Sequence, residues 1–407
     1  MENNSKPESI ARHFSERFSR FGRPAAIFLA ALLLSAFCLR YLPLPFIWLG
    51  WGWSLGLLAG AWYLGTNSLR VVLFNVAVVV LMLACAETYL GLRQPPPPMY
   101  SDPYYVDDDV LGVVPTRGVE ARSTRLEHGR LLYDVTYTID SNGLRIAPPV
   151  QPSPVASILF FGCSFTFGEG LQDAETIPYQ VGLQSAGRYK IYNFGFHGYG
   201  PNQMLAYIES GRVQHIVDTP PQFAIYQALP DHVARVAGKI PYGKHSPRYQ
   251  LDSDGSVHQH GHFDDGQVAL SPLRARLRGQ LRKSAIFRTL ENLQPRTDRK
   301  DVQLLLATVR ESRDLLEKDY PGIEFRVILW RNFANEEPLY QELRKGFAQL
   351  NIPVDLVDTI LPDYSTNPEK YLLSVTNGHP NALADRLIAR YVTAKVLSRT
   401  TNRNLSN

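Results

Sequence analysis

Cysteine is scarce in this chain, with only three among 407 residues, at Cys38, Cys85 and Cys163. The first two fall in long apolar stretches, so the rest of the chain holds a single thiol and cannot form an internal disulfide. The cysteines also lack the spacing of a metal-binding motif. The sequence therefore predicts a fold without disulfides, and we expect neither a metal nor a bound cofactor.

A strong charge of either sign is also absent, because 42 basic residues nearly balance 38 acidic ones and leave a formal charge of +4. Domains that bind nucleic acid usually carry a marked basic excess, so nucleic acid is not expected as a partner. His258, His260 and His262 alternate and would share one face of a strand. No carboxylate or cysteine accompanies them at ligand spacing, so the sequence does not predict a metal site there.

Long apolar runs, by contrast, fill the first quarter of the chain, over residues 24–42, 46–66 and 71–92. Each is long enough to cross the roughly 30 Å hydrocarbon layer of a bilayer as a helix. A polar arm, residues 1–23, precedes the first run, and no small-residue cleavage site stands out, which favours a retained anchor over a cleaved signal peptide. The sequence predicts about three transmembrane helices within residues 24–92.

The basic residues around these runs set the expected orientation. They are Lys6, Arg12, Arg17, Arg20 and Arg23 in the arm, and Arg70 before the third run. Basic segments favour the cytoplasmic side of a membrane. Three crossings then place everything after Leu92 outside the cytoplasm, whereas two would place it inside. We expect a multi-pass protein of the inner (plasma) membrane with a periplasmic domain, and we expect Glu87 to reach the membrane interface.

The part after the membrane region divides into a lead-in and a larger domain. Residues 94–98 read QPPPP, a stiff polyproline segment, and short strand patterns follow, so residues 93–152 are predicted to be a linker and an accessory β lead-in. Over residues 153–400, buried-strand patterns alternate with helical patterns, which predicts an α/β fold with a doubly wound, mostly parallel sheet in three layers (α/β/α). Residues 237–295 interrupt this alternation and are predicted to be an insertion beside a cleft.

The segment ILFFGCSFTFGEG, residues 158–170, places a serine directly after an apolar strand pattern. Ser164 would emerge at the carboxyl edge of the sheet, where open α/β folds bind their ligands. Gly162 and Gly168 permit a tight turn and a close approach of substrate. By itself the segment also fits an ordinary turn after a strand.

Two further segments supply partners for such a serine. His379 lies before Pro380, on the predicted loop into the last helix, where it can act as a general base toward a hydroxyl group. The loop NFGFHGYG, residues 193–200, contains three glycines and offers the backbone N–H groups that an oxyanion hole requires. Taken singly, a structural histidine and a plain glycine-rich turn remain open.

Together these segments resemble the ordered sequence blocks of the SGNH (GDSL-like) hydrolase superfamily, over about residues 157–398. The matching residues are Ser164 in GCSFTFGEG, Asn193 and Gly198 in NFGFHGYG, and His379 in GHPNA. The resemblance implies an SGNH-like fold with Ser164 as nucleophile and His379 as base. It also implies an oxyanion hole formed by the backbone N–H groups of Ser164 and Gly198.

The sequence departs from the family pattern where a side-chain amide normally completes the oxyanion hole. The family has Gly-x-Asn-Asp after the next strand, but this chain has ALPD, with Pro230 in place of the asparagine. Gln227 or His232 could reach the same space. The candidates for lining the substrate cleft are Asn193, Gln227, Asp231 and His232.

A second departure affects the residue that orients the histidine. The family usually has aspartate three residues before the histidine, where this chain has Thr376. Asn377 is the nearest carboxamide, and its carbonyl oxygen can orient an imidazole by accepting the Nδ1 proton. A pair of serine and histidine alone also remains open, as does an acidic third member from further along the chain, namely Asp358, Asp363 or Asp385.

These observations lead us to expect a membrane-anchored SGNH-type serine esterase that works through an acyl-enzyme. Its expected substrates are acyl or acetyl esters of a cell-envelope glycan or lipid, and its expected partners are the lipid bilayer and that substrate. An O-acyltransferase acting on an extracytoplasmic polysaccharide is one alternative, because both enzymes share the acyl-enzyme step. A degenerate, non-catalytic glycan-binding protein is the other, because of Pro230 and Thr376.

Overall fold

The computed structural model describes residues 46–63, 67–93, 98–101, 103–127, 129–240, 242–265, 277, 279–292, 297–331 and 337–398. The chain divides into two compact units. One unit comprises residues 1–94 and 269–291, and the other comprises residues 95–268 and 292–407. The first predicted membrane run, residues 24–42, lies outside the described residues.

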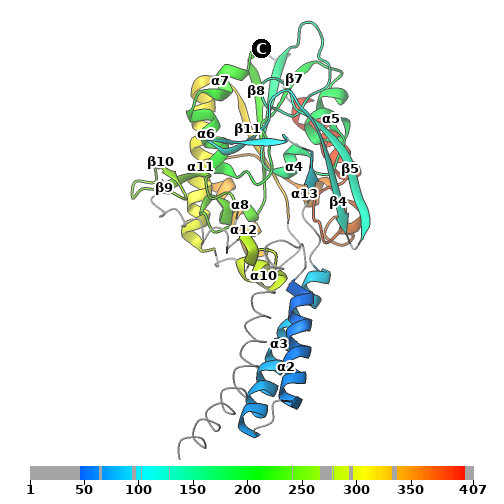
Figure 1. Cartoon of the computed structure of the whole chain (residues 1–407). Coiled ribbons are helices and arrows are strands. Elements are labelled where there is room, and N and C mark those ends of the chain that lie inside the picture. The colour runs from blue at the N-terminus through cyan, green and yellow to red at the C-terminus, as the bar shows by residue number, and fades with distance from the viewer. Residues whose placement is uncertain are drawn as a thin grey trace, which may run out of the picture. The chain divides into compact units, whose positions relative to one another are not determined.

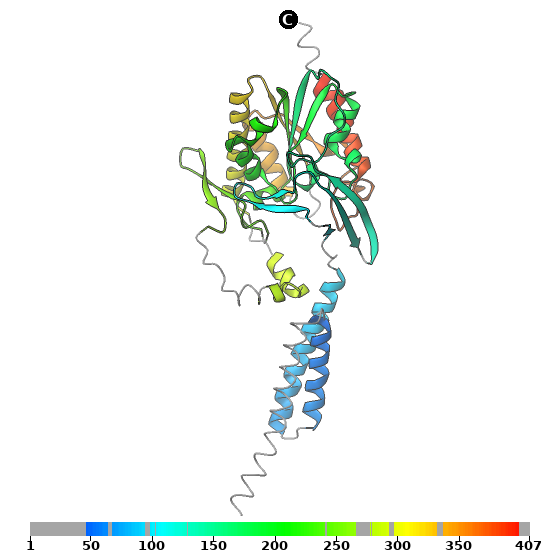
Figure 2. The same ribbon diagram turned by 45° about the horizontal axis from the view of Figure 1, so that its top comes forward.

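The first unit contains two long helices, α2 (Phe46–Tyr63) and α3 (Asn67–Arg93), which pack side by side (Figures 1 and 2). Gly50 allows a close approach, because a Cβ atom at this position would lie 2.9 Å from the Cβ of Ala84. The indole Nε1 of Trp51 donates to the hydroxyl of Thr88 across 3.3 Å. Small residues and a polar contact are typical of helix pairs in membranes.

Only one helix of the described residues is long and apolar enough to cross a membrane, namely Ser68–Arg93 within α3. The sequence predicted about three. Helix α2 is shorter and contains four tryptophans and several glycines, whose hydropathy is close to zero, so it does not reach the same mean hydropathy. The structure therefore supports one candidate membrane helix and not several.

Glu87, which the sequence led us to expect near a membrane interface, is buried at the amino end of helix α10 (Ala285–Asn292). Its carboxylate accepts the backbone N–H groups of Ala285 at 2.5 Å and Ile286 at 3.0 Å, and the hydroxyl of Ser284 at 2.8 Å. A helix start favours negative charge, and these donors offset the cost of burying a carboxylate. The Glu87 carboxylate on α3 thus binds the amino end of α10, although the two helices are distant in sequence.

Replacing Glu87 with alanine should release α10 from α3 and loosen the backbone around the basic residues at and just before the start of α10. We expect trypsin to cut the full-length chain in detergent faster after Arg282, Lys283 and Arg288, as followed by mass spectrometry. Thr88→Ala is the matched control, since Thr88 bonds to Trp51 on α2 and its loss should leave cleavage unchanged. Equal cleavage rates in Glu87→Ala and the parent would contradict the role of this carboxylate.

The second unit is built on a parallel five-stranded sheet in the order β12-β11-β8-β6-β7. Counted along the chain this order is 2-1-3-4-5, an arrangement of doubly wound folds whose ligands bind where the strand order reverses, here between β6 and β8. The predicted parallel α/β sheet is confirmed. Its strands are β6 (Ala156–Phe161), β7 (Tyr189–Asn193), β8 (Pro221–Ala228), β11 (Glu324–Leu329) and β12 (Val354–Leu356).

Helices cover both faces of this sheet (Figure 1). The strand β6 shows why: Leu159 and Phe161 point into one apolar cluster, whereas Ile158 and Phe160 point into another, so both faces must be shielded from water. The first face packs against α6 (Pro201–Glu209), α7 (Arg212–Ile216), α8 (Asp231–Val236), α11 (Arg299–Asp319) and α12 (Glu337–Gln349). The second packs against α5 (Ile177–Gln184), α13 (Val357–Ile360), α14 (Ala382–Tyr391) and the π-helical turn Val392–Leu397.

The segment before the parallel sheet is made of short antiparallel strands. They are β1 (Met99–Tyr100), β4 (Glu120–Glu127) and β5 (Arg130–Thr138) in one sheet, and β2 (Tyr105–Asp108) paired with β3 (Gly112–Pro115). A further hairpin, β9 (Pro247–Leu251) with β10 (Val257–His262), lies within the predicted insertion. Buried residues of β4 and β5, such as Ala121 and Tyr137, belong to the same apolar cluster as the sheet core.

Arg145, seven residues after β5, joins these strands to the loop after α4 (Ser164–Phe167). Its buried guanidinium donates to the carbonyl oxygens of Phe167 and Gly168 at 2.7 Å and of Leu171 at 2.6 Å, and to the carboxylate of Asp173 at 2.9 Å. It also lies over the ring of Tyr137, with 4.6 Å between the guanidinium carbon and the ring centroid. One side chain therefore bonds to four acceptors of this loop.

Replacing Arg145 with methionine should remove four hydrogen bonds and leave the buried carbonyl oxygens of Phe167 and Leu171 without a donor. Breaking a buried ion pair from one side costs about 3–5 kcal/mol, so we expect a clearly lower midpoint of thermal unfolding. Arg122→Met is the control, because Arg122 pairs with Asp134 at the protein surface and such pairs contribute little. A midpoint lowered equally in both variants would contradict the special role of Arg145.

Candidate active site

Four strand ends converge at one edge of the parallel sheet and line a cavity of about 930 Å³. Ser164 follows β6, Gly198 follows β7, Asp231 follows β8 and Trp330 follows β11. Parallel strands all present their carboxyl ends at the same edge, and the cavity includes the point where the strand order reverses. The sequence-predicted serine therefore opens into the place where folds of this kind bind ligands.

The turn that carries Ser164 depends on glycine at position 162, whose φ of 149° is unfavourable for other residues. A Cβ atom on Gly162 would lie 2.2 Å from the hydroxyl oxygen of Thr166. Ser164 begins the short helix α4, so its backbone N–H belongs to a first helical turn and has no intrahelical acceptor. Both the hydroxyl and this N–H are thereby available to a bound group.

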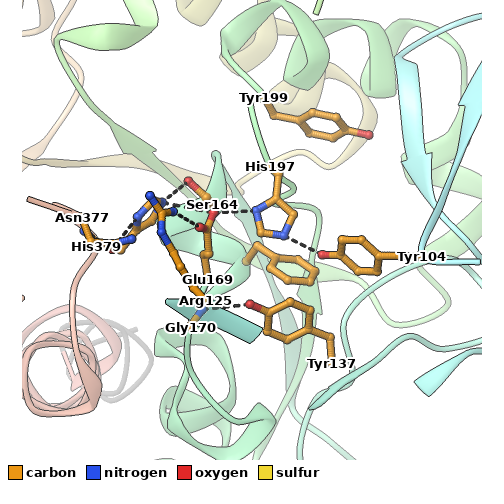
Figure 3. Close-up of polar contacts among 12 residues, drawn as sticks. Tyr104, Arg125, Tyr137, Ser164, Glu169, Gly170, His197, Tyr199, Asn377 and His379 are labelled. Atoms are coloured by element: carbon orange, nitrogen blue, oxygen red, sulfur yellow. Dashed lines mark hydrogen bonds and ion pairs between the residues drawn. The ribbon is translucent and has the colours of Figure 1, made fainter. Parts of the chain in front are cut away.

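Ser164, His379 and Asn377 form a hydrogen-bonded row (Figure 3). The hydroxyl oxygen of Ser164 lies 2.8 Å from Nε2 of His379, and Nδ1 of His379 lies 3.0 Å from Oδ1 of Asn377. The backbone N–H of His379 also donates to Oδ1 of Asn377 at 3.1 Å, which identifies this atom as an acceptor. Nδ1 therefore carries the proton, and the bare Nε2 can accept the proton of Ser164.

The other three candidates for the third position bond elsewhere. Asp358 pairs with Arg331 at 3.1 Å, Asp363 pairs with Lys370 at 2.8 Å, and Asp385 accepts the backbone N–H of Ile177 at 3.1 Å. Asn377 is thus the residue that the structure brings to Nδ1 of His379.

The residues predicted for the oxyanion hole and the substrate cleft fall into two groups, those that line the cavity and those that are buried away from it. Gly198, with a φ of 74°, and Asp231 line the cavity with Ser164. The other three candidates are buried and bond within the protein: Asn193 donates to the carbonyl oxygen of Thr166, Gln227 accepts from Trp330, and His232 contacts the hydroxyl of Tyr226. Asn193, Gln227 and His232 are buried and are not among the residues that line the cavity.

The three alternating histidines, at which the sequence does not predict a metal site, lie on strand β10, where His258 and His260 are exposed and His262 is partly buried. His258 pairs with Asp252 at 3.1 Å, and His260 contacts Arg248 at 2.9 Å. A shift in the strand register separates His262 from these two. Over the described part of the chain, no three histidine, cysteine, aspartate or glutamate side chains form a group that could hold a metal ion.

Glu169 is the residue of the site that sequence reasoning missed. Its Oε2 lies 3.3 Å from Nε2 of His379 and 2.9 Å from Nδ1 of His197, so the carboxylate stands between two imidazoles (Figure 3). Its other oxygen lies 3.4 Å from Arg125 and 3.4 Å from the hydroxyl of Tyr133. The available signal was a carboxylate between two glycines, five residues after the serine.

The antiparallel strands also contribute side chains to the cavity wall, although we did not predict any functional residue in them from the sequence. Tyr100 of β1 and Arg125 of β4 line the cavity. The hydroxyl of Tyr104 lies 2.5 Å from Nε2 of His197, and the hydroxyl of Tyr137 accepts the backbone N–H of Gly170 at 2.9 Å. The lead-in therefore holds His197, which contacts the Glu169 carboxylate, and Gly170, which follows Glu169 in the chain.

Burial and charge act on the two ionisable groups in opposite ways. Burial lowers the pKa of His379 below its ordinary 6.5, although the charge of Glu169 counteracts part of this effect. Burial raises the pKa of Glu169, but His379, His197 and Arg125 outweigh it, and the net pKa lies well below its usual range. The resting site thus contains a neutral histidine beside an ionised glutamate.

Comparisons with known proteins find only remote likeness. No family model matches the chain, and no curated protein matches it. Among solved structures, TesA has 13% identity and a TM-score of 0.33, with 59% of this chain and 99% of that chain covered. The SGNH-hydrolase family esterase AlinE4 has 17% identity and a TM-score of 0.30, with 62% and 98% covered.

The acetyl xylan esterase Est2A from the rumen bacterium Butyrivibrio proteoclasticus has 10% identity and a TM-score of 0.35, with 64% of this chain and 68% of that chain covered. At these TM-scores the similarity supports no transfer of residue roles.

The lowered pKa of His379 predicts how the reactivity of Ser164 depends on pH. A protonated imidazole cannot accept the serine proton, so reactivity should fall only when the pH drops below 6.5. The measurement is the rate at which a fluorophosphonate probe labels the full-length chain between pH 4 and 9. His379→Gln should label far more slowly than the parent chain above the midpoint of the parent's pH profile and should lack that pH dependence. A midpoint above 6.5 in the parent chain would contradict the effect of burial.

Proposed function

We propose that this chain is a membrane-anchored serine esterase of the SGNH type that works through an acyl-enzyme. The observation that carries the proposal is the 2.8 Å contact between the Ser164 hydroxyl and Nε2 of a histidine whose other nitrogen donates to Asn377. This arrangement activates a hydroxyl group as a nucleophile. A protein that only binds glycan has no need of it.

In the proposed reaction, Oγ of Ser164 bonds to the acyl carbon while its proton moves to Nε2 of His379. The carbonyl oxygen becomes an oxyanion, and the N–H groups of Ser164 and Gly198 are the proposed donors to it. The ester bond then breaks, and the departing alcohol takes the proton from Nε2. Water, deprotonated by the same nitrogen, attacks the acyl carbon of the acyl-enzyme. The bond from this carbon to Oγ of Ser164 breaks, Oγ takes the proton back from Nε2, and the acid is released.

The cavity supports a substrate of moderate size. Its volume of about 930 Å³ lies within the range of small-molecule sites, which is roughly 300–1,000 Å³. Aromatic side chains and arginines share its wall, including Tyr100, Phe165, Arg235 and Tyr242. Such a wall suits a sugar or a lipid headgroup that carries a short acyl ester.

The candidate membrane helix in α3 supports a substrate in the cell envelope. We propose that the chain lies in the inner membrane, with residues after Leu92 on the periplasmic side, as the basic residues near the membrane runs favour. The proposed substrate is an acyl or acetyl ester of an envelope glycan or lipid. An acceptor hydroxyl in place of water would make the same site an O-acyltransferase.

The test is hydrolysis of an aryl acetate by the full-length chain purified in detergent, beside Ser164→Ala, with fluorophosphonate labelling in parallel. We expect turnover and labelling in the parent and neither in Ser164→Ala. Loss of a nucleophile of this kind typically lowers kcat by roughly 10⁶-fold. Arg122→Met is a control for general damage, since Arg122 lies on the surface.

The remaining outcomes separate the alternatives. Labelling that depends on Ser164, without hydrolysis, would favour a transferase that lacks its acceptor, and adding a glycan acceptor should then restore turnover. A folded chain that shows neither labelling nor hydrolysis would contradict the proposed esterase and favour the glycan-binding alternative.

A further inference from the structure

The row formed by Ser164, His379 and Asn377 lacks a negative charge. Asn377 accepts the Nδ1 proton of His379 and so fixes the ring, but its amide is neutral. When the serine proton moves to Nε2, the imidazole becomes a cation, and a buried cation is unfavourable without a nearby anion. The charge must come from another residue if the proposed reaction is to be efficient.

We propose that Glu169 supplies this charge as a positioning residue that acts through His379, an inference that rests on the proposed function. Its carboxylate lies 3.3 Å from Nε2, the nitrogen that receives the proton, whereas an acidic residue before the histidine would lie at Nδ1. Orientation and charge compensation are thus divided between Asn377 and Glu169.

The surroundings of Glu169 keep it ionised and in place. His197 donates to Oε2, with 2.9 Å between the atoms, and Tyr104 contacts the far nitrogen of the same ring. Arg125 lies 3.4 Å from Oε1 and balances the charge of the carboxylate. Gly168 and Gly170, with φ values of 85° and 79°, turn the backbone on either side of Glu169 so that its side chain faces His379.

The contact between Glu169 and His379 strengthens during the reaction. In the resting state the Nε2 lone pair accepts the Ser164 proton and offers nothing to the carboxylate. After proton transfer, Nε2 carries a hydrogen and a positive charge, and the carboxylate can accept from it. An interaction that is stronger after proton transfer than before lowers the barrier, whereas one of constant strength does not.

The first test compares Glu169→Gln with the parent chain by the pH dependence of aryl acetate hydrolysis and by the pKa of His379. An opposite charge at this distance raises a histidine pKa by roughly 1–3 units, so the acid limb should move to lower pH by about one unit or more. We expect kcat to fall about 10- to 100-fold, since one pKa unit corresponds to a factor of ten. The charged or titratable groups that face His379 are Glu169, His197, Arg125 and Arg235.

The pKa of His379 is read directly from ¹⁵N chemical shifts of histidine-labelled chain in detergent, with His379→Gln to assign the signal. This readout does not depend on ester turnover, so it distinguishes failure of this inference from failure of the proposed function. Asp231→Asn, which removes another carboxylate from the same cavity wall, should move the pKa of His379 much less. An unchanged His379 pKa in Glu169→Gln would overturn the inference.

A double-mutant cycle with Asn377→Asp supplies the second test. In the Glu169→Gln background, aspartate at Nδ1 should raise the His379 pKa and restore kcat about tenfold or more, because the lost charge returns from the other side of the ring. In the parent background the same substitution should change kcat less. Equal effects in both backgrounds would mean that Glu169 acts only in structure and would overturn the proposal.

Discussion

A single buried guanidinium holds the loop on which the site depends. Arg145 bonds to three carbonyl oxygens and one carboxylate between Phe167 and Asp173, and this stretch includes Glu169. A loop with several inward-facing carbonyl oxygens cannot be buried unless these oxygens find donors. Because Arg145 comes from the segment before the parallel sheet, that segment is part of the machinery that fixes the site and is more than a spacer.

The arrangement around His379 shows how the task of one residue can be divided between two. In the serine-histidine-aspartate arrangement, one carboxylate both orients the ring and compensates its charge. Here Asn377 makes the orienting contact at Nδ1, and the nearest carboxylate, Glu169, is at Nε2. Glu169 approaches Nε2, the nitrogen that also contacts the Ser164 hydroxyl, so a change in any one of Ser164, His379 and Glu169 alters the electrostatic environment of the other two.

The sequence predicted the parts of the site that depend on local patterns. Ser164 was found because an apolar strand pattern ends in a glycine turn, and His379 because it precedes the last helix. Asn377 lies two residues from His379, so local spacing was enough to suggest their contact. The alternation of strand patterns with helical patterns along the chain was also sufficient to predict the parallel sheet. The strands of such a sheet are apolar on both faces, as β6 is.

The missed residues depend on contacts between distant segments. Glu169 meets His197 and His379 only after β7 and the last loop are in place, and no spacing in the sequence relates these three residues. Arg145 and Arg125 were missed for the same reason, since a single arginine in a strand-rich segment has no periodic signal. Gln227 and His232 were expected at the cleft because they flank the strand end, but their polar atoms turn toward Trp330 and Tyr226.

Glu87 illustrates the same limit in the first unit. An acidic residue in an apolar helix suggests contact with water at a membrane interface, because the sequence shows only the helix that carries it. Its actual partners, the backbone N–H groups at the start of α10, come from about 200 residues later. In both units, therefore, a buried carboxylate, Glu87 or Glu169, is bound by donors that are remote in sequence. The local sequence pattern shows the acidic residue but does not show which groups it binds.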